Sequence, residues 1–270
     1  MRRSLLIAPL LWLLALPAWS DARMTVLVDL LDLREVAAIL RQEGQAHAST
    51  LNQEMLGGQG GPGWQMQVDT IYDPDRMVEM VRRALEETLQ DDALEAAIAF
   101  YSSDLGGQVI EMENAARAAI SEGAVEDAAR ERFAELDGTD DPRLAQITQL
   151  LIAGDMIDRN VSTALNSNFQ FLKGLRDGGA LADSEEDLLA DVSADLDRVT
   201  EDTRAWLYAY MLLAYHPLDD AALSRYIEFA QSEAGRAVNR GLFKGFGKAY
   251  EDISYALGRT VALNMTAEEL

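Results

Sequence analysis

Few residues of this 270-residue chain have the type and spacing that chemistry would need. The two histidines, His47 and His216, are far apart in sequence, and there is no cysteine. Zinc sites and activated nucleophiles normally combine several such ligands or bases. We therefore predict no catalytic, cofactor-binding or metal-binding residues, and we interpret both histidines as surface or helix-end residues.

Carboxylate pairs are the only other candidate for catalysis. Asp91 with Glu95, or Asp220 with Glu228, would suit a hydrolase acting on an envelope glycan, because two carboxyl groups suffice as acid and base. Asp91 and Asp220 also stand where helices are expected to start, and an aspartate there caps the free N–H groups. A carboxylate-dependent envelope hydrolase is thus the alternative function, behind a non-enzymatic protein.

Three aspartates, Asp187, Asp191 and Asp195, are spaced by four residues, so they share one face of a helix. Calcium takes oxygen ligands only, but this spacing lacks the turn of a calcium loop. We interpret the three as a solvated helix face.

Four basic residues are also spaced by four and form what we call the basic stripe: Arg236, Arg240, Lys244 and Lys248. Two interpretations are open. The stripe lies against carboxylates of the same chain, where it adds little stability, or it docks an anionic partner, such as a protein, a lipid headgroup or an acidic envelope polymer. Beside it, Gly241, Gly245 and Gly247 predict a face where another helix packs closely.

Trp64 and Trp206, with the face that carries Met77 and Met80, suit either an apolar groove or ordinary core packing. The glycine-rich segment 57–63 lacks the Gly-Lys-Ser/Thr ending of a phosphate-binding loop, so we expect a plain loop there.

The elements that position these residues are all predicted to be helices, because apolar residues recur at helical rather than alternating spacing. Asp73-Pro74, Ser103 and Asp141-Pro142 are typical helix starts. The expected helices cover residues 26–55, 74–89, 91–101, 104–120, 125–136, 144–175 and 184–215, with two more split near Gln231 and Ser232.

An internal repeat is the most informative feature. Eight residues recur 129 positions later, namely Asp91, Ala93, Leu94, Ile98, Phe100, Ser103, Gly106 and Val109, repeated as Asp220, Ala222, Leu223, Ile227, Phe229, Ser232, Gly235 and Val238. Each copy reads as a helix ending in an aromatic residue, a serine-capped turn and a second helix with glycine in its first turn. We predict a structural role for Phe100, Ser103 and Gly106 and for Phe229, Ser232 and Gly235.

The first copy, Ile98-Ala-Phe-Tyr-Ser-Ser-Asp-Leu-Gly-Gly-Gln108, resembles the FY-x-S-x-x-G core of the bacterial envelope family catalogued as domain of unknown function 2059. The second copy is divergent, with Ala230 in place of the tyrosine. The resemblance implies a tandem of exported helical domains, and it brings no catalytic residues.

The N-terminus is typical of a signal peptide: Arg2 and Arg3, an apolar run from Leu5 to Leu16, and small residues ending near Ser20. The apolar run would extend about 18 Å as a helix, short of the roughly 30 Å of a bilayer core. We therefore expect cleavage near Ser20, a periplasmic mature protein and no transmembrane segment in it.

The net charge and the absence of cysteine exclude some partners and some ways of stabilising the fold. The full chain has a net charge of −23, and without Arg2 and Arg3 it would carry 21 basic and 46 acidic residues. Such a chain repels nucleic acid, so we predict no nucleic-acid partner, and with no cysteine it relies on packing rather than disulfides.

Together these features predict an all-α helical bundle built from two related multi-helix repeats, preceded by a cleaved signal peptide. The expected units are a signal peptide at 1–20, a first repeat at 21–137 and a second at 138–270, with one continuous helical domain as the alternative. We expect a non-enzymatic binding or scaffold protein of the cell envelope.

Overall fold

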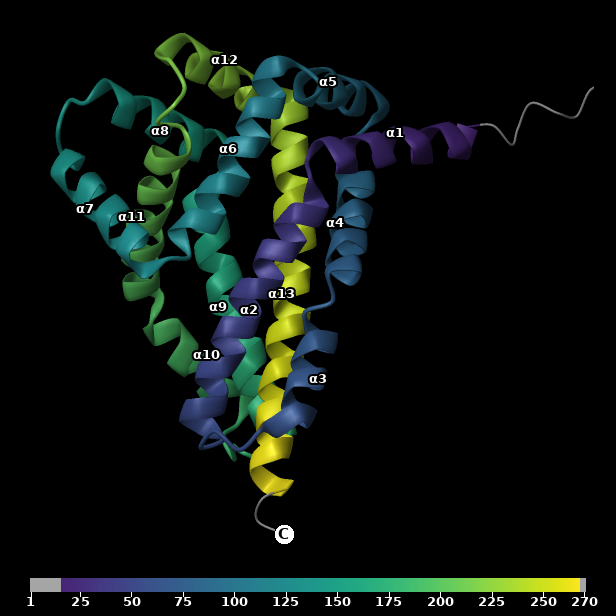
Figure 1. Ribbon diagram of the computed structural model, residues 1–270, viewed down its shortest axis with the longest axis vertical. Helices are drawn as coiled ribbons and strands as arrows, with labels where there is room; N and C mark the ends of the chain where they lie inside the picture. Colours follow the sequence, from purple (N-terminus) through teal and green to yellow (C-terminus); the bar gives the residue numbers. More distant parts are fainter. Residues whose placement is uncertain (1–15, 268–270) are drawn as a thin grey trace, which may run out of the picture.

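The computed structural model describes residues 16–267, and these residues form helices joined by turns, with no strand among them (Figure 1). The prediction of an all-α fold is confirmed. The helices are α1 (Leu16–Leu30), α2 (Leu33–Met55), α3 (Gly61–Ile71), α4 (Pro74–Thr88), α5 (Asp91–Tyr101), α6 (Asp104–Ile120), α7 (Gly123–Leu136), α8 (Pro142–Ala153), α9 (Met156–Asp177), α10 (Glu185–Ala194), α11 (Leu196–Ala214), α12 (Asp220–Gln231) and α13 (Glu233–Ala267).

The predicted helix starts are confirmed by their caps. The Asp73 carboxylate accepts from the N–H of Asp75 at 3.0 Å, the Ser103 hydroxyl from Gly106 at 3.1 Å, and the Asp141 carboxylate from Leu144 at 2.9 Å. Each cap satisfies an N–H that the first helical turn leaves free.

Two of the predicted long helices are broken instead. The helix expected over 26–55 is divided between α1 and α2 at Asp32, and the one expected over 144–175 is divided between α8 and α9 at Asp155. Asp32 (φ 46°) and Asp155 (φ 53°) are left-handed, and they are the only residues other than glycine with positive φ in the described chain. Aspartate adopts this conformation more readily than most residues, and the left-handed turn redirects the chain.

Two smaller differences concern the glycine-rich segment and the acidic helix. Gly61, Pro62 and Gly63 belong to α3 rather than to a loop, because Trp64 and Val68 are buried and draw this segment into a helix against the core. The helix expected over 184–215 ends at Asp195 and restarts, because α10 packs on α9 whereas α11 also packs on α7.

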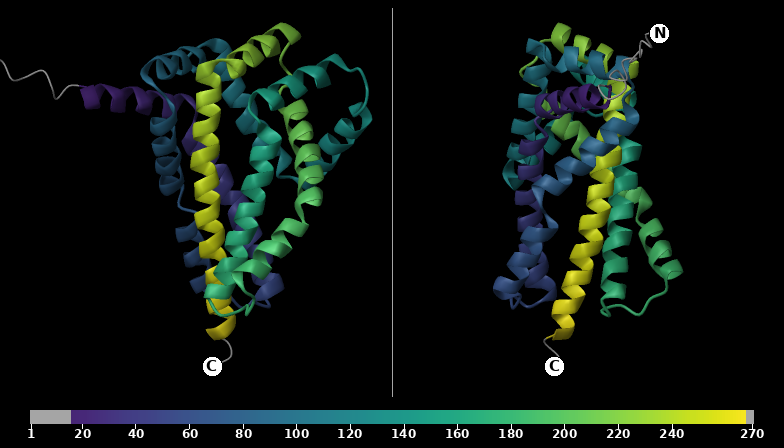
Figure 2. Two further views of the ribbon diagram at one scale, coloured as in Figure 1. Left: turned by 180° about the vertical axis from the view of Figure 1, so that it is seen from behind. Right: turned by 90° about the vertical axis from the view of Figure 1, so that its right-hand side faces the viewer.

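The long helix α13 runs the length of the molecule and packs against both α9 and α4 (Figures 1 and 2). Its contact with α4 is close: a Cβ on Gly241 would lie 2.6 Å from the Thr88 hydroxyl, and one on Gly245 would lie 2.5 Å from the Val81 Cα. The predicted close helix contact is therefore confirmed for these glycines, which leave room for α4.

The two halves of the chain place their helices in matching ways. In the first half, α1 packs on α5 and α2 packs on α4; in the second, α8 packs on α12 and α9 packs on α11. The left-handed aspartates join α1 to α2 and α8 to α9.

The two motif copies also share their local geometry and meet in the core. The hydroxyls of Ser103 and Ser232 accept from Gly106 and Gly235 at 3.1 and 3.0 Å. A Cβ on either glycine would lie 2.1 Å from the carbonyl oxygen of the motif phenylalanine, so glycine is required at both turns. The rings of Phe100 and Phe229 stack with their centroids 3.8 Å apart.

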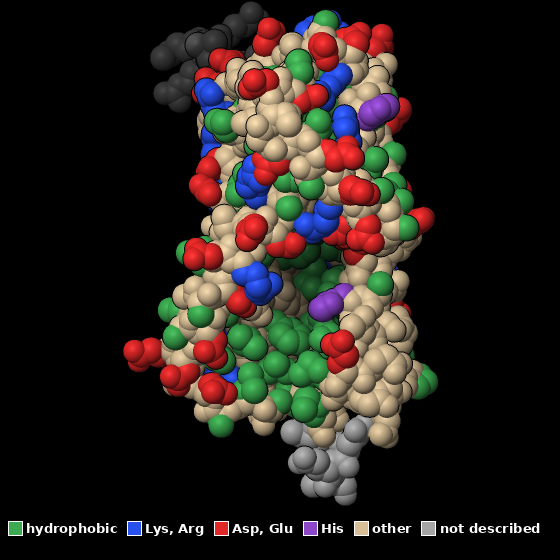
Figure 3. Space-filling model, turned by 90° about the vertical axis from the view of Figure 1, so that its left-hand side faces the viewer, with side chains coloured by type: hydrophobic (Ala, Val, Ile, Leu, Met, Phe, Trp, Pro, Cys, Tyr) green, Lys and Arg blue, Asp and Glu red, His purple; other side chains and the backbone are tan. Residues whose placement is uncertain are grey.

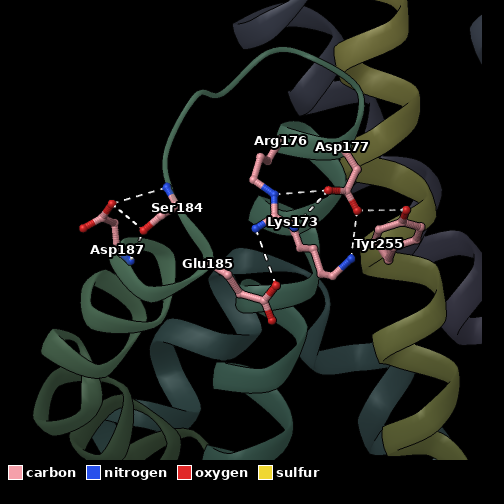
Figure 4. A network of polar contacts seen from close by, with 7 residues as sticks. All are labelled: Lys173, Arg176, Asp177, Ser184, Glu185, Asp187 and Tyr255. Carbon is pink, nitrogen blue, oxygen red and sulfur yellow. Dashed lines mark hydrogen bonds and ion pairs between the residues drawn. The ribbon is translucent and has the colours of Figure 1, made fainter.

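A polar network ties the lower ends of α9 and α13 together (Figure 4). Asp177 at the end of α9 accepts from Lys173 at 2.8 Å, from Arg176 at 3.0 Å and from the Tyr255 hydroxyl of α13 at 3.2 Å. The hydrogen bonds from Lys173 and Arg176 lower the pKa of Asp177 to about 2. In the same view, Ser184 and Asp187 form the capping box that starts α10.

The hydrophobic cores combine helices from both sides of residue 138. One core joins Trp64 and Met77 to Leu175 and Leu257, and another joins Leu85 and Leu94 to Val238. None of the described helices is long and apolar enough to cross a membrane. The proposed signal peptide falls mainly on residues 1–15, outside the described residues, and its last residues, 16–20, belong to α1.

Candidate functional site

A cavity of about 310 Å³ lies in the middle of the bundle, between α2, α5, α6, α9, α11, α12 and α13. Its wall is mainly aliphatic and aromatic, with a few polar groups. The residues that line it include Leu33, Val36, Leu40, Tyr101, Ile110, Glu113, Asn114, Arg117, Met156, Asn160, Thr163, Trp206, Tyr210, Met211, Tyr226, Phe229, Val238, Asn239, Leu242, Phe243, Phe246 and Tyr250. An apolar wall with a small number of polar groups is typical of small-molecule sites.

The second helices of the two motif copies provide much of this wall. Glu113 and Arg117 line it from α6, and Leu242 and Phe246, which lie 129 residues further on, line it from α13. The serine-capped turns set the start of each helix, and therefore fix which of its residues reach the cavity.

Glu113 is the main polar group of the cavity. Its Oε1 accepts hydrogen bonds from the hydroxyls of Tyr226, at 3.0 Å, and Tyr215, and its backbone carbonyl accepts from Tyr210 at 3.1 Å. No residue in the described chain donates to Oε2. Burial raises the pKa of Glu113 above its ordinary value, although the two tyrosine hydrogen bonds oppose this shift.

The tyrosines around Glu113 stay protonated, so Tyr215 and Tyr226 donate hydrogen bonds to its carboxylate and Tyr210 donates one to its backbone carbonyl. Burial raises the pKa of Tyr215, Tyr226, Tyr210 and Tyr101, and the nearby charge of Glu113 adds to each shift. Tyr215 and Tyr226 come from the end of α11 and from α12, so three elements meet at this one carboxylate.

Arg117 and Glu43 form an ion pair at the edge of the cavity. The Arg117 Nε donates to Glu43 Oε1 at 2.7 Å and its Nη2 donates to Oε2 at 2.6 Å, which is the bidentate geometry of a strong pair. The guanidinium also lies over the Trp206 ring, 5.2 Å from its centroid, and Trp206 stacks on Tyr210. Burial alone would lower the pKa of Arg117, but the hydrogen bonds to Glu43 raise it above its ordinary value.

Beyond this ion pair lies an outer hollow of about 700 Å³ between α2, α6, α9 and α11. It shares Arg117, Asn160, Thr163, Trp206 and Tyr250 with the wall of the cavity, so the two spaces adjoin. Figure 3 shows the face that carries α10 and α11: it is hollowed near the middle, with hydrophobic side chains exposed below. Arg117 lines both spaces and Glu43 lines the outer hollow only, so the ion pair lies at the boundary between them.

The structure divides the basic stripe into two parts. Lys244 pairs with Glu87 of α4, and Lys248 pairs with Asp252 of its own helix at 2.7 Å. Arg236 and Arg240 are exposed, and no carboxylate in the described chain forms an ion pair with them. The stripe lies outside the cavity wall.

The predicted motif residues lie at the top of the cavity or next to it. Phe229 and Gly235 line the cavity, whereas Phe100 packs on Phe229 behind the wall. Ser103 and Ser232 cap their helices, as described above.

Three of the four carboxylates considered for hydrolysis are held by arginines. Arg23 contacts both Asp91, at 2.5 Å, and Glu95, at 2.9 Å, and Arg143 contacts Asp220 at 3.0 Å. None of them lines the cavity, and neither does Glu228.

The remaining candidates are separate from the cavity or from one another. Asp187 accepts hydrogen bonds from Ser184 in the capping box of α10, and Asp195 contacts Arg198 at 3.0 Å. Within residues 16–267, no group of three or more His, Asp or Glu is placed to hold a metal ion. Both histidines are exposed. Trp64 packs with Met77 in a core, whereas Trp206 lines the cavity, so the two tryptophans do not share a groove.

Sequence reasoning missed Glu113, Arg117 and Glu43. A signal was present for Glu113, because Val109, Glu113, Ala116 and Ile120 follow the spacing of one buried helix face, and an acidic residue there is unusual. Its tyrosine partners lie 102 and 113 residues away along the chain. The sequence alone could not place them beside it.

Comparison with known proteins gives one match. Residues 75–135 match the family described as "Uncharacterized protein conserved in bacteria (DUF2059)", which covers α5, α6 and nearly all of α4 and α7. The match includes the first motif copy and Glu113 but not the second copy. No curated protein and no solved structure matches the chain.

Proposed function

We propose that this chain is a non-enzymatic binding protein whose central cavity holds a small, largely apolar molecule. The observation that carries the proposal is the cavity itself: about 310 Å³ of space in the middle of the bundle, lined mainly by aliphatic and aromatic side chains. Well-packed interiors contain few voids larger than a water molecule, so a space of this size suggests a ligand rather than imperfect packing.

We propose further that the protein acts in the periplasm, after cleavage near Ser20, and that it consists of two related units at 21–137 and 138–270. The composition of residues 1–20 supports export. The matching caps, the matching helix contacts and the left-handed aspartates at corresponding junctions support the two units.

Docking of an anionic envelope partner remains a second proposal, now restricted to Arg236 and Arg240. The observation that favours it is their exposure without an ion pair in the described chain, although 46 acidic residues are available. The double variant Arg236→Glu/Arg240→Glu should lose the partner in a pull-down from envelope extract, whereas Lys244→Glu should retain it. If the double variant still bound the partner, Arg236 and Arg240 would have no docking role.

The cavity is tested with a neutral apolar probe, N-phenyl-1-naphthylamine, whose fluorescence rises in apolar surroundings. Thr163 lies on the wall shared by the cavity and the outer hollow. The larger side chain of Thr163→Trp should fill part of the space where the two meet, and weaken binding of the probe about tenfold or more. Ser162→Trp is the matched control, because Ser162 is exposed at the preceding position of α9 and lines neither space. Equal binding by both variants, or no binding by the unmodified protein, would contradict the proposal.

A further inference from the structure

The charged groups of the cavity wall do not balance one another. Among residues 16–267, Glu113 and Arg117 are the only charged residues that line it. The charge of Arg117 is already neutralised by Glu43, which holds both its Nε and its Nη2 and lines the outer hollow instead. Glu113 is therefore an acidic group of the wall without a basic hydrogen-bond partner in the described chain.

The contacts of Glu113 leave one oxygen for a ligand. Tyr215 and Tyr226 both donate to Oε1, and Oε2 accepts from no residue in the described chain. A buried carboxylate without a positive partner is costly, and the cost falls when a cation binds beside it. The groups that face Glu113 from other helices are Tyr101, Tyr210, Tyr215 and Tyr226, and none of them supplies positive charge.

Aromatic rings surround the same space. Tyr101, Tyr226 and Phe229 line the cavity from α5 and α12, and Trp206 and Tyr210 line it from α11. Aromatic faces attract organic cations through the ring quadrupole, most strongly where water is excluded. The surrounding protein, with a net charge of −23, also favours the approach of cations over anions.

We infer that the ligand of the cavity is an organic cation with an apolar body, such as an alkylammonium compound, whose charged nitrogen lies beside the Glu113 carboxylate among these rings. The inference rests on the proposed binding function and adds the chemical class of the ligand. The cation binds the ionised form of Glu113, so a Glu113 that is protonated in the free protein releases its proton when the cation binds.

Three ligands with the same ten-carbon chain but a positive, zero or negative charge show how much of the affinity depends on charge and how much on apolar contact. Decyltrimethylammonium, decanol and decyl sulfate compete with N-phenyl-1-naphthylamine, each below its micelle concentration and at constant ionic strength. We expect the cation to bind about tenfold or more tightly than decanol. We expect Glu113→Gln to abolish this preference and to change the affinity for decanol by less than about threefold.

The pH dependence of the unmodified protein gives an independent readout, which holds even if Glu113→Gln does not fold. Affinity for the cation should rise with pH up to the raised pKa of Glu113 and then level off, because protonated Glu113 does not attract the cation. Affinity for decanol should not change. Calorimetry in two buffers of different ionisation enthalpy should show proton release with the cation only, at a pH below that pKa.

The outcomes distinguish the inference from the function on which it rests. If decanol or decyl sulfate binds as tightly as the cation, or if Glu113→Gln keeps the preference, the inference fails and the binding function stands. If none of the three binds, both fail.

Discussion

The helices α6 and α13 follow the same capped motif, yet they contribute opposite chemistry to the cavity. At positions 129 residues apart, α6 has Glu113, Asn114 and Arg117, whereas α13 has Leu242, Phe243 and Phe246, and all six line the cavity. The turns that start the two helices have the same hydrogen bonds. The capped turn and its glycine therefore set where the side chains lie, while the residues about two to three turns later are free to differ in chemistry.

The largest expected effect comes from separating the two proposed units, residues 21–137 and 138–270. Because all three cores of the described chain combine residues from both sides of Gly138, we expect neither residues 21–137 nor residues 138–270 to fold alone. Limited proteolysis at the 137–141 turn, followed by separation of the fragments and circular dichroism, checks this expectation. A cooperative melting transition in either isolated fragment would show that the two units are separable domains.

The next test asks whether the two glycines are equivalent. Gly106→Ala and Gly235→Ala each place a Cβ about 2.1 Å from a backbone carbonyl, so each should destabilise the protein by about 2–3 kcal/mol through local strain. Gly107→Ala is the control, since nothing lies within 4 Å of its Cβ, and alanine there should stabilise the helix by about 0.5–1 kcal/mol. Urea denaturation measures all three. If only one of the variants Gly106→Ala and Gly235→Ala lost stability, the two turns would not be equivalent.

The polar side of the cavity is tested through the ion pair. Glu43→Ala leaves the Arg117 charge unbalanced at the edge of the cavity, so it should weaken decyltrimethylammonium binding by about tenfold and strengthen decyl sulfate binding. Competition binding measures both constants. Glu35→Ala, an exposed glutamate on the same helix that lines neither space, should change neither. If the affinities for both ligands fell by the same factor, the role of Glu43 would be structural only.

The caps should give equal and smaller effects. Ser103→Ala and Ser232→Ala each remove one hydrogen bond to a free N–H, at a cost of about 1 kcal/mol. Ser102→Ala is the control, because Ser102 is exposed and caps no helix start. Losses that differ by more than experimental error, measured by urea denaturation, would show that the surroundings of the two turns differ energetically.

The smallest effect is expected at the polar contact between α9 and α13. Asp177 joins these two helices, as the Glu43–Arg117 ion pair joins α2 to α6. Because the pKa of Asp177 is lowered to about 2 in the folded protein, its contribution is complete above the ordinary carboxylate range and is lost as pH falls toward 2. The melting temperature of Asp177→Asn should therefore lie below that of the unmodified protein at pH 6, and the difference should narrow at pH 3. A difference independent of pH would assign the effect to packing.

Much of the fold could be predicted from local signals, and much of the cavity could not. Asp73, Ser103 and Asp141 define helix starts because their caps involve residues two or three positions away. The breaks at Asp32 and Asp155 were missed because a left-handed aspartate has no distinctive local sequence. The cavity depends on contacts between distant residues, such as Glu113 with Tyr215 and Arg117 with Glu43, and the helical pattern does not contain them.

The length and position of α13 have a consequence for how the chain is made. Residues 233–267 form one helix that contacts α2, α3, α4, α5, α9 and α12, and they leave the ribosome after all of these partners. Until then, the surfaces of α4 and α9 that α13 covers stay open to solvent. We therefore expect the nascent chain to bind chaperones until α13 has been synthesised, and the surfaces of α4 and α9 to be covered only then.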